Sequence, residues 1–92
     1  MPTVIDSSVQ TRTYLVDGQP TVTIGTERIV PYRLTITHRE MDRAPIPTSI
    51  TVQLNGYFEG TKLRNTYELA PDQRPAWITE LVNDDAPTWW PR

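Results

Sequence analysis

The sequence predicts an α+β fold, in which a four- to five-stranded antiparallel sheet, largely a meander, is followed by one C-terminal helix packed on one face. Three observations indicate this fold. Apolar and polar residues alternate through most of residues 8–70, which is the period of half-buried strands. Glycine-containing turn sequences separate the alternating segments. One stretch near the C-terminus instead carries apolar residues at helical spacing.

The length of the chain allows one domain. Its 92 residues bury only a thin core, and a second independent core would not fit. We expect a single domain over residues 1–92, made of a flexible N-terminus (1–7), an antiparallel sheet (8–70), a helix (72–84) and a tryptophan-containing tail (85–92).

The first two predicted strands, 8–16 and 21–24, are expected to form a hairpin. Asp17-Gly18 lies between them, and this pair favours a tight turn because glycine accepts positive φ and aspartate bonds its own backbone. Residues 25–27 form the next break, again with a glycine.

The third predicted strand, 28–38, has the clearest alternation in the chain. Its two faces carry Tyr32, Leu34, Ile36 and His38 on one side and Arg33, Thr35, Thr37 and Arg39 on the other. Pro31 lacks an N–H, so we expect it before the central pairing region or on an edge.

Two further strands, 49–58 and 62–69, complete the predicted sheet after a proline-containing loop at 40–47. Gly56 interrupts the alternation, which predicts a bulge or bend at this point.

The predicted helix follows the sheet. Asp72 is a candidate cap, Pro75 suits an early position, and Asp84 and Asp85 face the unfavourable end of the helix dipole, so the helix should end near Asn83. The expected core comprises Leu34, Ile36, Ile50, Val52, Leu54, Leu63, Tyr67, Leu69, Trp77, Ile78, Leu81 and Val82.

Residues able to support catalysis are sparse. The chain has no cysteine and one histidine, His38, which we interpret as a residue at the rim of the sheet. No serine stands in a nucleophile elbow, and the four glycines form no phosphate-binding loop. We therefore expect no enzyme activity, no metal site and no cofactor.

The C-terminal tail is the sharpest candidate binding segment. Trp89 and Trp90 are adjacent and project in different directions when extended, and tryptophan and arginine are enriched at binding hot spots. Three placements stay open for the tail: the chain's own core, a dimer seam or a partner. With Arg92, and with Arg39 and Arg43 from the 39–47 loop, these residues predict a non-catalytic module that binds a protein partner of unknown identity.

The polar sheet face offers an alternative function. Arg33, Thr35, Thr37 and Arg39 could bind nucleic acid or a nucleotide, although the net charge of −2 argues against a polyanionic partner. An open sheet also leaves two unpaired edges, which makes a homodimer a further alternative.

The closing pattern, Pro-Ala-Trp-Ile-x-x-Leu-Val at 75–82 and Ala-Pro-Thr-Trp-Trp-Pro at 86–91, follows arginine-rich, lysine-poor strands. In this it resembles small proteins of actinobacteria and their phages. The resemblance implies an accessory protein such as an adaptor, inhibitor or regulator. The chain begins without a basic, apolar leader and has no run long enough to cross a bilayer, so we expect a cytoplasmic protein with no membrane contact.

Overall fold

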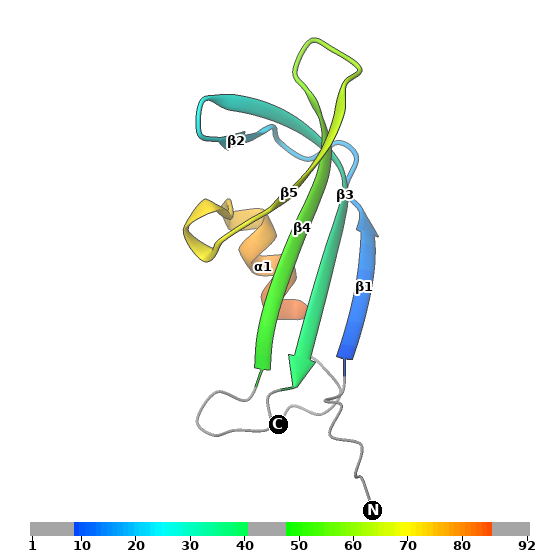
Figure 1. Cartoon of the computed structure of the whole chain (residues 1–92), viewed down its shortest axis with the longest axis vertical. Helices are drawn as coiled ribbons and strands as arrows, with labels where there is room; N and C mark the ends of the chain where they lie inside the picture. Colours follow the sequence, from blue (N-terminus) through cyan, green and yellow to red (C-terminus); the bar gives the residue numbers. More distant parts are fainter. Residues whose placement is uncertain (1–8, 41–47, 86–92) are drawn as a thin grey trace, which may run out of the picture.

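A computed structural model describes residues 9–40 and 48–85 of the chain (Figure 1). It confirms the α+β class, with a five-stranded antiparallel sheet and one C-terminal helix. In chain order the elements are β1 (Val9–Leu15), β2 (Val22–Ile24), β3 (Glu27–Glu40), β4 (Thr48–Phe58), β5 (Arg64–Glu68), a 3₁₀ turn η1 (Pro71–Gln73) and α1 (Ala76–Asp84).

The long strand β3 organises the sheet. The strand order is β1-β3-β4-β5, and β2 pairs with β3 as well. Strands β3, β4 and β5 follow one another as a meander, as predicted. The first half of β3 pairs with β2 and the second half pairs with β1, so one strand has two short partners in succession.

The predicted hairpin between the first two strands is wrong. The chain does turn at Asp17-Gly18, but β1 and β2 each pair with β3 and not with each other. The tighter turn lies at Gly25-Thr26, where Gly25 has φ of +63°. A two-residue connection of this kind closes a hairpin at little entropic cost, which favours pairing of β2 with β3.

A register shift between Pro31 and Arg33 interrupts the β3–β4 ladder, opposite Gly56. The predicted irregularity near Gly56 is therefore present, but the extra residue, Tyr32, lies in β3. Pro31 does not lie on an edge, but it does lie before residues 33–39, the part of β3 that pairs with both β1 and β4. It is buried in the central strand, between the segments that pair with β2 and β1, where the bulge already breaks the ladder.

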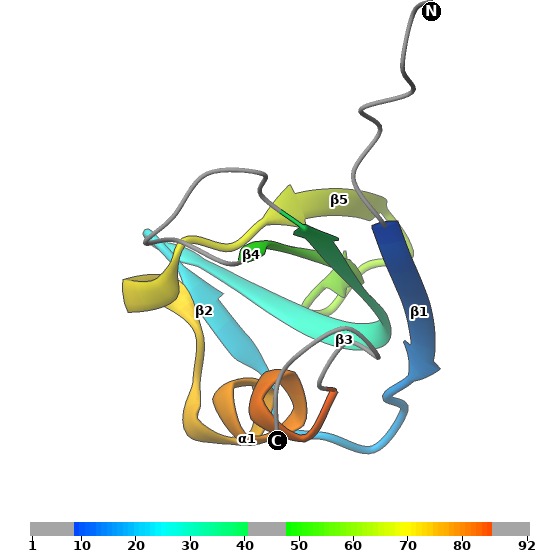
Figure 2. The same cartoon turned by 90° about the horizontal axis from the view of Figure 1, so that it is seen from below.

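The core lies between one face of the sheet and α1, which crosses that face (Figure 2). Its buried apolar residues are Val16, Val22, Ile29, Leu34, Ile36, Val52, Leu54, Leu69, Ile78 and Val82. Most of the predicted core is confirmed. Leu63 is an exception: it is 65% exposed, because β5 begins only at Arg64 and Leu63 belongs to the preceding turn.

The helix begins at Ala76 and not at residue 72 as predicted. Asp72 lies in η1, and α1 has Pro75 as its N-cap residue, with an extended backbone. Proline disfavours the helical conformation for the residue before it, and Arg74 is accordingly extended. This separates η1 from α1. At the other end the backbone N–H of Asp85 donates to the carbonyls of Leu81 and Val82.

Candidate functional site

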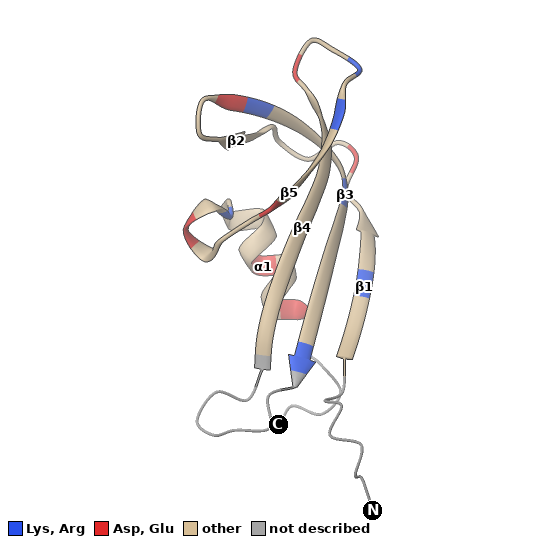
Figure 3. Cartoon of the chain, viewed as in Figure 1, with Lys and Arg blue, Asp and Glu red and all other residues tan. Residues whose placement is uncertain are grey.

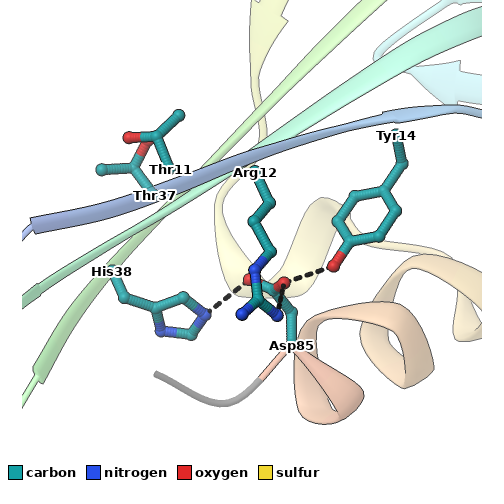
Figure 4. Close-up of polar contacts among 6 residues, drawn as sticks. All are labelled: Thr11, Arg12, Tyr14, Thr37, His38 and Asp85. Carbon is teal, nitrogen blue, oxygen red and sulfur yellow. Dashed lines mark hydrogen bonds and ion pairs between the residues drawn. The ribbon is translucent and has the colours of Figure 1, made fainter. Parts of the chain in front are cut away.

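The most distinctive polar group in the core is the carboxylate of Asp85, which is 1% exposed (Figure 4). Arg12 Nη1 donates to Asp85 Oδ1 over 3.2 Å, and the Tyr14 hydroxyl donates to the same oxygen. His38 Nε2 lies 3.0 Å from the other oxygen, Oδ2. Because an ionised carboxylate only accepts hydrogen bonds, this contact requires a proton on Nε2. We call these four residues the Asp85 cluster.

Each donor of the Asp85 cluster comes from a strand that faces α1. Arg12 and Tyr14 are alternate residues of β1, and His38 lies near the end of β3. The contacts span 47 to 73 residues of sequence, so they join the end of the helix to both strands. Burial and the hydrogen bond to Asp85 raise the pKa of Tyr14, and contact with Tyr14 together with the charge of Asp85 raises the pKa of Arg12.

The interpretation of His38 as a rim residue is wrong, because its side chain is completely buried. A histidine bonded to a carboxylate is the pairing that orients a general base in many enzymes. Here both side chains have 0% exposure, and each carboxylate oxygen already accepts a bond from the chain itself. The arrangement therefore fastens α1 to the sheet.

The opposite face of the sheet, which we call the outer face, carries the predicted polar residues. Register places Arg33, Thr35, Thr37 and Arg39 on it together, as the alternation predicts. Facing β1 residues extend the rows: Thr11 Oγ1 lies 3.3 Å from Thr37 Oγ1, and Thr13 Oγ1 lies 3.3 Å from Thr35 Oγ1. No described helix crosses this face.

Two tyrosines and two arginines gather on the outer face at the end nearer the β4–β5 turn. The rings of Tyr32 and Tyr57 have centroids 5.1 Å apart. The Arg64 guanidinium lies 5.7 Å from the Tyr32 centroid and 5.5 Å from that of Tyr57, and the Arg33 guanidinium lies 5.8 Å from the Tyr32 ring. We call these four residues the Tyr/Arg cluster. The prediction that Tyr32 lies on the core face is wrong, because the bulge shifts it out of phase with Leu34.

Charge is unevenly distributed over the described part of the molecule (Figure 3). The outer face carries Arg28, Arg33, Arg39 and Arg64 against two described carboxylates, that of Glu59, which pairs with Arg28, and that of Glu68. The helix α1 itself is acidic, since it contains Glu80 and Asp84 and no basic residue. The outer face is thus locally positive on a chain with a net charge of −2.

The predicted partner-binding residues Trp89, Trp90, Arg92 and Arg43 lie outside the described residues. Arg39 lies within them and is exposed at the far end of β3 from the Tyr/Arg cluster. The three placements considered for the tail stay predictions.

No protein family, curated protein or solved structure matches the chain. Within residues 9–40 and 48–85, no helix is both long and apolar enough to cross a membrane. The same residues contain no group of three or more acidic or histidine side chains placed to hold a metal ion.

Sequence reasoning missed both clusters. One signal for the Asp85 cluster was present: His38 falls in phase with Leu34 and Ile36, and a polar residue on a buried face needs a partner. Its partner is 47 residues away, and no local pattern identifies it. The Tyr/Arg cluster depends on the bulge, whose position in β3 the alternation does not reveal.

Proposed function

We propose that the chain is a non-catalytic protein-interaction module and that the Tyr/Arg cluster on the outer face is its contact site. The observation that carries the proposal is the gathering of Tyr32, Arg33, Tyr57 and Arg64 on a sheet face that no described helix covers. Tyrosine and arginine are enriched at the centres of protein interfaces, and tyrosine, with only two side-chain torsions, loses little entropy on binding.

The surroundings of the cluster support a protein partner. Leu15, which faces Arg33 across the β1–β3 pair, is 77% exposed, and Val30, which faces Tyr57, is 39% exposed. Apolar side chains beside aromatic and guanidinium groups can be buried by a protein surface. Threonine and asparagine side chains on the neighbouring rows supply a polar rim of the kind that surrounds such anchors.

The stacking contacts also hold the cluster in place before binding. Arg64 contacts both tyrosine rings, so its long side chain is already partly ordered in the free chain. Binding then costs less side-chain entropy than an isolated surface arginine would lose.

The proposal is tested by affinity capture from host lysate with the tagged chain and with a double variant, Arg33→Ala with Arg64→Ala. Both side chains are exposed, so the variant should fold normally, which circular dichroism checks. We expect a stoichiometric protein partner with the parent chain and its loss with the double variant. Arg39→Ala is the control on the same face outside the cluster, and it removes one positive charge where the double variant removes two. Retention of the partner by the double variant would rule out the Tyr/Arg cluster as the contact site.

A second candidate function is binding of single-stranded nucleic acid by the same face. The observation that favours it is the presence of two aromatic rings beside Arg33 and Arg64, since bases stack on aromatic side chains while arginines contact phosphates. Nuclease treatment separates the two functions. Nucleic acid would be favoured over protein if nuclease treatment abolished recovery of the captured partner. It would also be favoured if the affinity of the chain for an oligothymidine fell steeply with salt concentration.

A further inference from the structure

One edge of the sheet is formed by β1, and its backbone pattern shows which groups face outward. The N–H of Val16 donates to the carbonyl of Tyr32, in register with the β1–β3 ladder. Bonded residues alternate in an antiparallel pair, so the even-numbered residues of β1 bond β3. The odd-numbered residues, Val9, Thr11, Thr13 and Leu15, turn their N–H and C=O groups toward the open edge. No described strand or helix pairs with that edge.

Apart from the charge of Arg12, the edge lacks the features that normally prevent pairing with another chain. Strand β1 contains no proline, no lysine and no glycine, and it runs for seven residues without a bulge. Val9 is 48% exposed and Leu15 is 77% exposed, although both lie in a regular strand. Seven consecutive paired residues are long enough to template a further strand.

The two exposed apolar residues are placed symmetrically in β1. Each lies three residues from Arg12, one on either side, and both point to the outer face with Thr11 and Thr13 between them. An antiparallel pair of identical strands with a two-fold axis at Arg12 therefore brings Val9 opposite Leu15 of the partner subunit. The same register brings Thr11 opposite Thr13 of the partner subunit.

We propose that the β1 edge binds a second copy of this chain, forming a two-fold dimer in which the two β1 strands pair antiparallel about Arg12 and join the sheets into one. Every outward N–H and C=O of the odd-numbered residues then has a counterpart on the other copy, as an isologous interface requires. Apolar side chains meet apolar ones at both ends, and threonines meet in the middle, a cross-strand pairing that favours antiparallel sheets.

The central pair of arginines is the one unfavourable element of this register, because like charges face each other across the axis. The guanidinium of Arg12 is held by its own Asp85 carboxylate at 3.2 Å, on the face toward α1. Each copy thus supplies a counter-charge for its own arginine. This interface depends on the edge of β1 and not on the Tyr/Arg cluster itself, and Leu15 is the residue that it shares with the surroundings of that cluster.

Disulfide trapping tests the register directly, because the chain has no cysteine of its own. In the double variant Val9→Cys with Leu15→Cys, the new thiol at position 9 of one copy faces the new thiol at position 15 of the other copy. The two thiols then lie at the separation that a disulfide spans. We expect a covalent dimer under mild oxidation. Each single variant is the control: its two thiols would lie about 20 Å apart at about 3.3 Å per residue, so neither should form the dimer. Equal trapping of a single variant, or none of the double variant, would overturn the proposal.

A second measurement uses the uncrosslinked chain. Sedimentation equilibrium should show a dimer for the parent and a monomer for Thr13→Pro, since the lost N–H points to the edge and proline is tolerated there within a fold. Far-UV circular dichroism checks that the variant keeps its sheet. A parent chain that stays monomeric, or a Thr13→Pro variant that still dimerises, would exclude pairing through β1. A monomer that binds an unrelated extended peptide at this edge would also contradict the proposal.

Discussion

At the scale of single residues, Asp85 occupies an energetically unfavourable position for a carboxylate. A carboxylate at a helix C-terminus faces the negative end of the dipole, and burial removes its hydration. Arg12, Tyr14 and His38 together replace the lost water with hydrogen bonds to both oxygens. The arrangement makes the last turn of α1 conditional on β1 and β3, so the helix end and the sheet should lose structure together.

Replacing Asp85 by asparagine should show this coupling. The variant places a neutral amide beside Arg12 and His38, so both contacts lose the negative charge of the carboxylate. We therefore expect the free energy of unfolding to fall by about 3 kcal/mol. Urea denaturation measures the change. Asp84→Asn, one residue earlier and exposed, is the control and should shift stability by less than about 0.5 kcal/mol. Equal small effects would show that the Asp85 cluster contributes little.

Tyr14 should make the protein sensitive to alkaline pH. Burial first, and then the bond to Asp85, raise its pKa above the ordinary value of about 10. The folded state thus holds the phenol proton more tightly than the unfolded chain. The resulting stabilisation is complete below pH about 10 and is lost as pH rises through the raised pKa. Tyrosinate absorbance of the parent minus that of Tyr14→Phe should titrate later than a free tyrosine, and an ordinary midpoint would contradict this.

At the scale of elements, the bulge in β3 and Gly56 in β4 depend on each other. A Cβ at position 56 would lie 2.7 Å from the carbonyl oxygen of Val30 and would also meet the Ile29 side chain. Gly56→Ala should therefore destabilise the fold by about 2 kcal/mol through overpacking against backbone. Gly60 provides a comparison, because it has φ of +83° and open space around it. Gly60→Ala should cost about 1 kcal/mol from backbone strain alone, so thermal unfolding should rank Gly56→Ala as the more harmful.

The elements also show what sequence could predict. Alternation from Leu34 to Arg39 placed both faces of β3 correctly, because period 2 and burial of one face leave a single consistent register. The partner of β2 could not be read in the same way, since a three-residue strand carries too little pattern to choose between neighbours. The helix start was misplaced because an acidic residue before Pro75 resembles a cap, while the proline's effect on Arg74 decides the boundary.

At the scale of the whole molecule, a thin core makes association energetically important. A chain of this length buries a modest fraction of its surface, so any interface that forms only in the folded state adds a substantial part of the total stability. Pairing of β1 strands would extend the sheet that carries the core, and it would make unfolding depend on protein concentration.

The melting temperature should therefore rise with concentration. For a dimer that unfolds to two chains, a tenfold increase in protein concentration raises the free energy of unfolding by half of about 1.4 kcal/mol per chain. This corresponds to a rise in melting temperature of about 3–5 °C for a domain of this size. Scanning calorimetry over two decades of concentration measures the shift. Thr13→Pro should melt at a temperature independent of concentration, because it cannot form the edge pair. A parent chain with the same constant melting temperature would show that one copy carries its full stability alone, and the outward groups of β1 would then be satisfied by water.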